Sequence, residues 1–412
     1  PAQRKAKSRP RSSLSRMAYA AAKAREVLGV LPDSVQLQVS GSIIKNVKSV
    51  IVPNTGHLKG MEAAVAAGII AGSAEKELEV ISEVSEEKKS AIRDYLQTVP
   101  ITIEHTEQGH VFDIVVTERC GQDYARVRIA DYHTNICRIE KNGTVLYEVP
   151  LLDETVQEDA RADRSLLNMQ DIWDFAETAD LRDVADLLER QIRYNNAIAE
   201  EGLLGDYGAN IGRVLLTTYG NDVSNRAKAK AAAGSDARMN GCELPVIINS
   251  GSGNQGITCS VPLIEYAKEL HSGKEKLYRA LIISNLVAIH EKTGIGTLSA
   301  YCGAVSAGAG AGAGIVYLCG DGYQAAIHTV VNALAIVSGI VCDGAKASCA
   351  AKIASSVDAA LLGYNMYKCN QEFKGGDGIV MKDIETTIKG IGRLGKDGMR
   401  QTNEEIIRLM MS

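Results

Sequence analysis

The sequence predicts an α+β protein, with an N-terminal portion of sheet and helix followed by a larger, mainly helical portion. Two observations support this fold class. Five short runs rich in β-branched residues follow one another between residues 101 and 149, separated by turn signals such as Asn142-Gly143. From Glu154 onward, apolar residues instead recur with the period of a helix. We therefore expect three segments: an atypical basic leader at 1–16, an α+β domain at 17–152 and a mainly helical domain at 153–412.

The composition is that of a soluble globular protein of two or three domains. Of the 412 residues, 45% are hydrophobic and 23% are charged, but only 5% are aromatic, so small aliphatic residues must build a closely packed core. His328 and Asn332 interrupt the best candidate for a membrane-spanning run, and no signal-peptide core is present near the start. We expect a cytoplasmic protein with no membrane partner, whose nine cysteines stay reduced.

The first residues carry a charge unlike the rest of the chain. Residues 1–16 hold six lysines or arginines and no acid, so the remainder carries −11 (the overall −5 minus 6). A basic tail can contact nucleic acid or a membrane surface. Nothing else in the chain supports a nucleic-acid partner, so we interpret this stretch as a disordered or artificial leader.

The expected N-terminal domain combines three helices with a sheet. Helices are expected at 17–28, 61–71 and 85–99. Alternating residues predict a strand at 35–40, and we expect 43–52 to continue as strand before a turn at 53–56. The later strand-like runs lie at 101–105, 111–118, 124–130, 135–139 and 144–149. We expect these five runs to form a meander of antiparallel strands.

The expected C-terminal domain is built from periodic helical patterns. Helices are predicted at 172–178, 181–200, 210–216, 222–233, 262–270, 277–289, 323–341, 347–362 and 403–410. Glycines at 375–378 predict a turn that leads into a short strand.

Two polar turns are candidates for binding a small anion. The first presents backbone N–H groups and a glycine that can adopt positive φ; its residues are Asn54, Thr55 and Gly56. The second, at 249–256, offers hydroxyls, amides and N–H groups suited to a carboxylate; its candidate residues are Ser250, Ser252, Asn254 and Gln255. The alternatives are a plain turn between strand and helix for the first and a flexible connector for the second.

Cysteines and glycines concentrate between residues 299 and 352. Cys342 and Cys349 are seven residues apart, which places them near one face if that segment is helical, and Cys302 precedes a glycine-alanine run. If 323–341 is one helix that carries the chain back, the three thiols could converge. Three thiolates with an open fourth position would suit zinc or an iron-sulfur cluster. The alternative is that they are small buried hydrophobes, which fits Cys319 better than the other three.

The glycine run predicts close packing around one helix. If 302–315 is helical, each glycine costs about 1 kcal/mol relative to alanine; these glycines are Gly303, Gly308, Gly310, Gly312 and Gly314. Close approach of another backbone, or of a ligand, is the usual compensation. A phosphate-binding loop is the competing interpretation, but no G-x-x-x-x-G-K-[ST] motif occurs.

Four stretches resemble one known family. They are SGSGNQGIT at 250–258, LSAYCGAVSAGAGAGAGI at 298–315, GIVCDGAKASCAAKIAS at 339–355 and SGSIIKNVKSVIVPNTGHLKGMEAAVAAG at 40–68. Together they resemble the L-cysteine desulfidase family, which is related to the alpha portion of bacterial iron-sulfur L-serine dehydratases. The resemblance spans nearly the whole chain from about residue 17.

The resemblance implies a four-iron, four-sulfur cluster held by Cys302, Cys342 and Cys349, with one iron left open to the substrate. That iron would act as a Lewis acid on the departing thiol of L-cysteine or hydroxyl of L-serine. Removal of the Cα proton would give aminoacrylate, whose hydrolysis yields pyruvate and ammonia, with sulfide released from cysteine. No pyridoxal phosphate is required. The turns at 54–56 and 250–255 would hold the carboxylate and amine of the substrate.

One position departs from the family pattern. The family opens with a Gly-Cys-Thr-Glu-Pro motif whose cysteine is a candidate for the catalytic base, and an ungapped alignment places Arg11 there. Arginine stays protonated and cannot serve as that base. We interpret this as an altered leader and expect weak or absent lyase activity with the cluster site intact. The rival hypothesis is an inactive iron-sulfur protein that senses iron, oxygen or cysteine.

Two further expectations concern ligands and assembly. Cys259 lies next to the polar turn at 249–256, and a fourth cysteine there could close the cluster. The helices rich in small residues would suit a homodimer interface.

Overall fold

The structure, a computed structural model, describes residues 12–48, 50–106, 112–130, 135–151, 163–296 and 299–411. It divides into two compact units, each of which is described by itself. The N-terminal unit contains 12–151, Asp343–Ala345 and 404–411, and the C-terminal unit contains Asp163–Cys342 and Lys346–Asn403. The predicted domain boundary after residue 152 and the leader position Arg11 lie outside the described residues.

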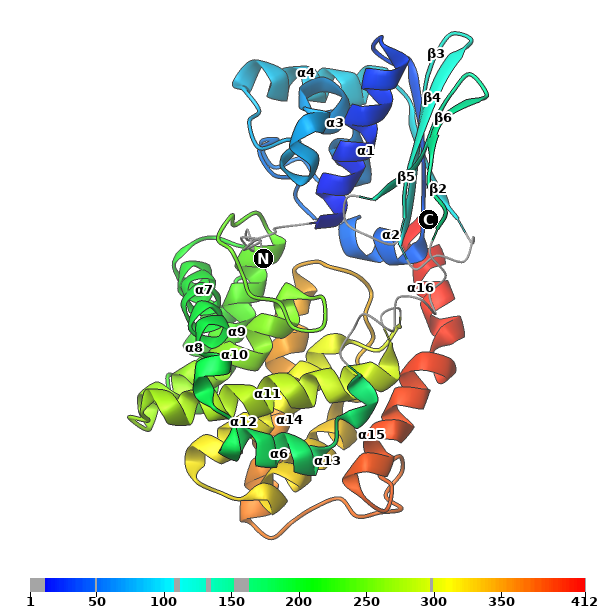
Figure 1. Ribbon diagram of the computed structural model, residues 1–412. Coiled ribbons are helices and arrows are strands. Elements are labelled where there is room, and N and C mark those ends of the chain that lie inside the picture. Colours follow the sequence, from blue (N-terminus) through cyan, green and yellow to red (C-terminus); the bar gives the residue numbers. More distant parts are fainter. Residues whose placement is uncertain are drawn as a thin grey trace. The chain divides into compact units, whose positions relative to one another are not determined.

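A six-stranded sheet organises the N-terminal unit and confirms the predicted α+β class (Figure 1). Its strands are β1 (Ser34–Val39), β2 (Ile101–His105), β3 (Asp113–Cys120), β4 (Asp123–Ala130), β5 (Ile136–Lys141) and β6 (Thr144–Glu148), in the order β2-β1-β3-β4-β5-β6. From β3 to β6 the strands form the predicted antiparallel meander. The prediction was wrong for β2, which pairs in parallel with β1 at the edge. The intervening helices provide the crossover that a parallel pair requires.

The prediction of a strand at 43–52 was also wrong, because α2 (Gly41–Val47) occupies this segment. Ser40 ends the sheet: its N–H donates to the Asp113 carbonyl at 3.0 Å and its Oγ accepts from the Asp113 N–H at 3.3 Å. Ile43, Ile44 and Val47 then share one helix face and are all buried. Burial of that face outweighs the β-propensity of isoleucine and valine.

Two alanine-rich helices cover one face of the sheet in succession. α1 (Ser12–Leu28) packs against β3 and β4, and α3 (Gly60–Ala71) packs against α1, with α4 (Glu86–Thr98) next to α3 (Figure 1). A Cβ on Gly68 would lie 2.2 Å from the carbonyl oxygen of Ala18, so only glycine permits this approach. Small residues thus replace aromatic packing, as the composition predicts.

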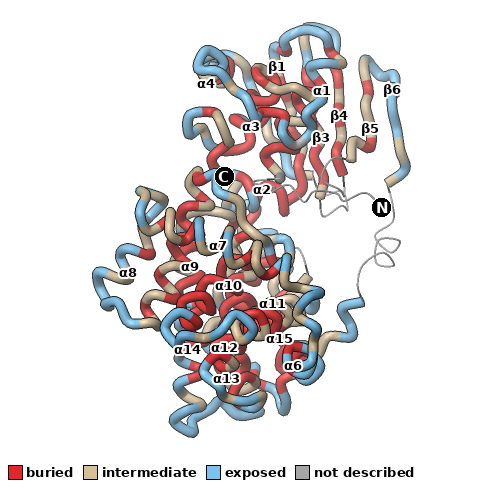
Figure 2. The backbone as a smooth tube through the Cα atoms, turned by 60° about the vertical axis from the view of Figure 1, so that its left-hand side comes forward, coloured by how far each residue is buried: buried red, intermediate tan, exposed pale blue. Residues whose placement is uncertain are grey.

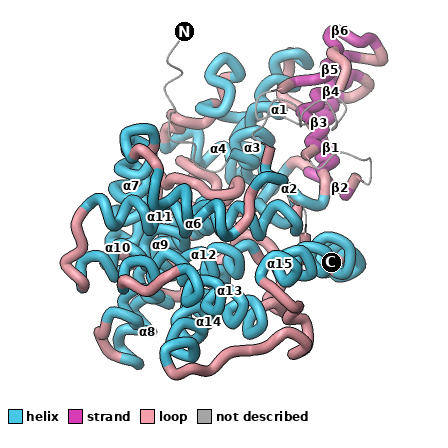
Figure 3. Tube along the Cα trace, turned by 60° about the horizontal axis from the view of Figure 1, so that its bottom comes forward, coloured by secondary structure: helices cyan, strands magenta, loops and turns pink. Residues whose placement is uncertain are grey.

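Helices joined by loops make up the described residues of the C-terminal unit, apart from isolated β-bridges (Figure 3). Its main helices are α6 (Met169–Thr178), α7 (Ala185–Leu204), α8 (Ile211–Tyr219), α9 (Val223–Met239), α10 (Gly253–Glu269), α11 (Lys274–Ile295), α12 (Gly303–Cys319), α13 (Tyr323–Val337), α14 (Ser348–Lys368) and α15 (Ile384–Arg393), and α16 (Arg400–Met411) starts in it. The predicted helices are confirmed. Nowhere in the described part of the chain is a helix long and apolar enough to cross a membrane.

The short strand predicted after 375–378 was wrong. The segment closes on itself instead, because the Gly376 N–H donates to the Val380 carbonyl at 2.9 Å. A capping box between Asp383 and Thr386 then starts α15, which the sequence analysis missed.

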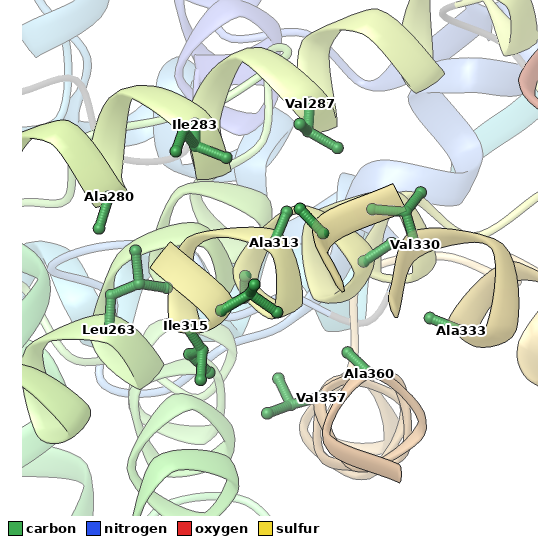
Figure 4. Close-up of a cluster of buried hydrophobic side chains, with 14 of the residues drawn as sticks. Leu263, Ala280, Ile283, Val287, Ala313, Ile315, Val330, Ala333, Val357 and Ala360 are labelled. Carbon is green, nitrogen blue, oxygen red and sulfur yellow. The ribbon is translucent and has the colours of Figure 1, made fainter. Parts of the chain in front are cut away.

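Helix α12 is buried on nearly all sides at the centre of the C-terminal unit (Figure 2). A Cβ on Gly308 would lie 2.7 Å from the backbone of Ser356 in α14, and one on Gly310 would lie 2.5 Å from the Ser284 carbonyl oxygen in α11. The predicted close approach of neighbouring backbones is therefore confirmed. Apolar side chains of α10, α11, α13 and α14 fill the remaining space around α12 (Figure 4).

Candidate functional site

Cys302 and Cys342 lie on two adjoining backbone segments of the C-terminal unit. Tyr301 forms an antiparallel bridge with Val341. The Cys302 N–H donates to the Ile340 carbonyl at 3.1 Å, and the Cys342 N–H donates to the Ala300 carbonyl at 2.5 Å. Helix α13 therefore carries the chain back to the start of α12, as the spacing of the cysteines predicted.

Cys349 lies in the first turn of α14 and shares the environment of the other two thiols. Burial raises the pKa of the Cys302 thiol to about 12; the Cys342 thiol adds to the rise and Cys349 adds less, while Lys352 opposes it. Lys352 follows Cys349 by one helical turn, and its Nζ donates to the Val341 carbonyl at 2.9 Å. This contact ties α14 to the segment that carries Cys342.

The chemistry of these donors fits an iron-sulfur cluster, since cysteine thiolates are its usual protein ligands. All nine cysteines lie in the described ranges and none forms a disulfide. Their side chains are not arranged as a ready ligand set: among the residues that the structure describes, no group of three or more His, Cys, Asp or Glu side chains is positioned to hold a metal ion. Cysteines 302, 342 and 349 would need side-chain rearrangement to ligate iron together.

The second polar turn is shorter than the sequence indicates, because α10 begins at Gly253. Asn249 and Ser252 close the turn through two backbone hydrogen bonds of 3.1 and 2.9 Å. Ser250, at a φ of 46°, donates its hydroxyl to the Asn249 side chain. Asn254 accepts a hydrogen bond from Arg238 at 3.1 Å. These side chains stabilise the turn and the start of α10.

Gln255 connects this turn to the cysteines. Its side chain is only 7% exposed and lies against Gly303, where a Cβ would be 2.5 Å from Nε2. Gly303 directly follows Cys302 and begins α12. The first turns of α10 and α12 therefore meet beside Cys302, and helix N-termini of this kind favour anions.

The first polar turn belongs to the N-terminal unit and is held by its own side chains. The Asn54 amide donates to the carbonyls of Ile81 and Ser82, at 3.0 and 3.3 Å. Thr55 is fully buried and donates to the Val52 carbonyl at 2.8 Å. The proposed role of Asn54, Thr55 and Gly56 in substrate binding stays a prediction; in the structure, the side chains of Asn54 and Thr55 hold the turn.

Two other cysteines differ from the three predicted ligands. Cys259 is fully buried and packs with Ala288 and Ala307 in a small apolar cluster. Cys319 ends α12, about 25 Å along the helix from Cys302 by the rise per residue. Cys319 is exposed, so the prediction that it is a small buried hydrophobe was wrong, and the length of α12 separates it from Cys302.

Three polar residues near the start of α12 are not among those predicted from the sequence. They are Glu291 on α11, Ser306 on α12 and Lys352 on α14. A signal existed for Glu291: it continues the face of Ile283 and Val287 at four-residue spacing, so it points into the core. Lys352 follows Cys349 at a spacing that shares its helix face.

Comparisons with known proteins agree with the resemblance found in the sequence. The family model described as serine dehydratase alpha chain matches residues 75–408. Among similar proteins, a UPF0597 protein of Desulfitobacterium hafniense is 60% identical over 396 residues, which cover 96% of this chain and 92% of that protein. A UPF0597 protein of Lachnoclostridium phytofermentans is 52% identical over 396 residues (96% and 94%), and one of Treponema denticola is 46% identical over 400 (96% and 93%).

Proposed function

Because the chain belongs to the serine dehydratase alpha chain family, we propose that it is a lyase that removes the β-substituent of a small amino acid. L-cysteine is the proposed substrate, giving pyruvate, ammonia and sulfide, and L-serine is the alternative, giving pyruvate and ammonia. The observation that best supports this proposal is the convergence of Cys302, Cys342 and the start of α14 beside Gln255. No pyridoxal phosphate takes part in this proposal.

The proposed cofactor is a four-iron, four-sulfur cluster held by Cys302, Cys342 and Cys349. When bound, such a cluster supplies a Lewis acid that polarises the departing sulfur or oxygen. The support is the thiol chemistry of these residues and their shared environment. Lys352 adds positive charge beside the thiols, which favours their ionised form.

The residues around Gln255 are proposed to bind the substrate carboxylate. The first turns of α10 and α12 offer backbone N–H groups and the positive ends of two helix dipoles. Ser250, Ser252 and Asn254, in and next to the turn, would line the entrance to the substrate site. The Gln255 side chain, which is buried, would line the site on its α10 side.

A second candidate function follows from position 11. Arg11 aligns with the cysteine that the related desulfidases carry as candidate base, and an arginine cannot remove the Cα proton. A chain that keeps the three thiols without a base would bind a cluster and sense iron, oxygen or cysteine without turnover. Replacing residues 10–14 with Gly-Cys-Thr-Glu-Pro separates the two functions: the lyase gains pyruvate formation, whereas the sensor stays inactive.

The first test is anaerobic reconstitution of the full chain with iron and sulfide. We expect about four irons and four acid-labile sulfides per chain, with a visible spectrum that L-cysteine or L-serine changes. Pyruvate and sulfide are then measured with each substrate, for the chain with and without the restored 10–14 motif. A protein that binds no iron, or one that turns over neither amino acid even with the motif, would contradict the lyase proposal.

A further inference from the structure

Contacts of the α12 glycines fix how three helices are aligned in the C-terminal unit. Along α12, Gly303 meets Gln255 and Gly314 meets Leu263, so α10 runs in the same direction. Gly310 meets Ser284 while Gly314 meets Ala280, so α11 runs in the opposite direction. Extending both alignments to Gly303 brings Gln255 of α10 and Glu291 of α11 to the first turn of α12. Ser306 lies at the end of that turn, near Glu291.

These three residues are Gln255 on α10, Glu291 on α11 and Ser306 on α12, which we call the polar layer. Gln255 is 7% exposed, Glu291 1% and Ser306 0%. Within the described part of the chain, Gln255 Oε1, both carboxylate oxygens of Glu291 and Ser306 Oγ have no hydrogen-bond partner. Several buried polar atoms without partners are thus concentrated around the first turn of α12, where three helices meet.

The surroundings make the polar layer costly unless it binds something. The same three helices contribute a small apolar cluster next to these residues, formed by Cys259, Ala288 and Ala307. Burial raises the pKa of Glu291 well above its usual value, and Ser306 is near enough to oppose that rise, although no hydrogen bond joins the two side chains. A buried polar group without a partner is strongly destabilising, and a buried charge without one more so.

The chemistry of the polar layer specifies its ligand. An amide oxygen, a hydroxyl oxygen and an ionised carboxylate all accept hydrogen bonds. An ammonium group has three N–H donors, and its positive charge would favour the ionised form of Glu291 despite the burial of that side chain. The layer adjoins Gly303 and hence Cys302, where the proposed function places the amino-acid substrate. We propose that Gln255, Glu291 and Ser306 bind the α-ammonium group of that substrate. This inference rests on the proposed function.

The test compares two ligands that differ only in the ammonium group. L-cysteine and 3-mercaptopropionate share the thiol and the carboxylate, but the second lacks the amine. Binding of each to the full chain, prepared anaerobically, is measured by isothermal titration calorimetry. Glu291→Gln should weaken L-cysteine binding about 10- to 100-fold, as expected for a lost hydrogen bond to a charged group, and leave 3-mercaptopropionate unchanged.

Glu118→Gln is the matched control, because Glu118 in the N-terminal unit is also a fully buried glutamate whose oxygens have no hydrogen-bond partner among the described residues. This variant should bind both ligands as the wild type does. Ser306→Ala is a second test should Glu291→Gln not fold, and it should weaken L-cysteine about fivefold while sparing 3-mercaptopropionate.

The remaining outcomes separate this inference from the proposed function. Equal weakening of both ligands in Glu291→Gln, or no weakening of L-cysteine, overturns the ammonium site while the lyase proposal stands. If the wild type binds neither L-cysteine nor L-serine, the proposed function fails and the ammonium site fails with it. A third outcome concerns free cations. If ammonium chloride or potassium chloride stabilises the wild type but not Glu291→Gln, and the substitution does not change L-cysteine binding, the polar layer binds a free monovalent cation instead.

Discussion

The two units achieve close helix packing with small residues in different ways. In the N-terminal unit, Gly68 of α3 admits the backbone of one neighbour, α1. In the C-terminal unit, Gly308 and Gly312 face α14, whereas Gly310 and Gly314 face α11. Glycines four residues apart share a helix face and those two apart do not. The alternating glycine-alanine run therefore specifies a helix with close neighbours on two sides.

The units also differ in where they bury polar atoms without partners. The N-terminal unit buries Glu118 in β3, against the sheet and its covering helices, and burial raises the pKa of this carboxyl well above its usual value. In the C-terminal unit, Ser235, Asp236 and Thr329 each contribute one such atom, whereas the polar layer groups four of them beside the first predicted ligand, Cys302. A grouping of this kind indicates a binding role, whereas a single group next to a sheet does not.

The largest expected difference between the units is the effect of cysteine substitutions on iron content. Cys302→Ser, Cys342→Ser and Cys349→Ser should each lower the iron content after anaerobic reconstitution from about four per chain to nearly none, because three thiolates hold the cluster. Cys120→Ser and Cys137→Ser, in strands β3 and β5 of the N-terminal unit, should keep full iron content. Iron and acid-labile sulfide analysis measures both sets. Full iron in any of the first three variants would rule out that cysteine as a ligand.

The glycine contacts predict the next largest effect. Gly310→Ala places a Cβ 2.5 Å from the Ser284 carbonyl oxygen, and Gly68→Ala places one 2.2 Å from that of Ala18. Because each clash is with backbone, we expect each variant to lose about 1–3 kcal/mol of unfolding free energy, despite the better helix propensity of alanine. Urea unfolding checks this, with far-UV circular dichroism for Gly68→Ala.

Trp173 gives a separate signal for the C-terminal unit. It is the only tryptophan of the chain and packs edge-on against Tyr317 at 5.4 Å between ring centroids, so its fluorescence follows the unfolding that Gly310→Ala affects. Gly390→Ala in α15 is the control, since its Cβ would meet only Met381 at 3.6 Å. It should stabilise the protein by up to about 1 kcal/mol. Destabilisation by Gly390→Ala as large as that by Gly310→Ala would show that close approach is not the cause.

The sequence predicted much of this architecture and part of the site. Helix α12 and the return of the chain through α13 follow from composition and spacing, since both depend on local pattern. The strand predicted at 43–52 became α2 because Ile43, Ile44 and Val47 fit either period, and only tertiary burial decides between them. Glu291 was missed because the partners of a buried polar residue come from helices far away in the sequence.

A buried carboxyl of the C-terminal unit predicts a pH effect. Burial raises the pKa of Asp236 to about 6, opposed by hydrogen bonds from the Ile211 and Ala209 amides. The folded state therefore keeps a proton that the unfolded chain, with a pKa of about 4, has released, so unfolding free energy falls as pH rises from about 4 to about 6. Urea unfolding followed by Trp173 fluorescence should show a smaller fall in Asp236→Asn than in the wild type; the buried Glu291, whose pKa is also raised, causes the part that remains.

Asp186→Asn is the control for this pH effect. Asp186 is an exposed residue in the first turn of α7, so its substitution should leave the fall between pH 4 and 6 in place. If Asp236→Asn shows the same fall as the wild type, another group causes it. If neither protein shows a fall, Asp236 releases its proton at the usual pH despite its burial.

Loss of a helix cap should have the smallest effect on the unfolding free energy, and one cap can be tested at the surface of each unit. Ser85 Oγ accepts from the Lys88 N–H at 3.3 Å at the start of α4, and Asn168 Oδ1 accepts from the Asp171 N–H at 2.9 Å at the start of α6. Each change to alanine should cost about 0.5–2 kcal/mol of unfolding free energy, with the longer bond of Ser85 at the lower end.

Ser90→Ala inside α4 separates capping from the loss of a hydroxyl. Ser90 is exposed in the helix interior, where alanine is the better helix former, so this change should stabilise by a few tenths of a kcal/mol, or about half a kcal/mol at most. Chemical unfolding of Ser85→Ala, Asn168→Ala and Ser90→Ala measures all three. If Ser85→Ala and Ser90→Ala lower the unfolding free energy equally, the position of the hydroxyl at the helix start does not matter. The Ser85 cap would then not stabilise α4.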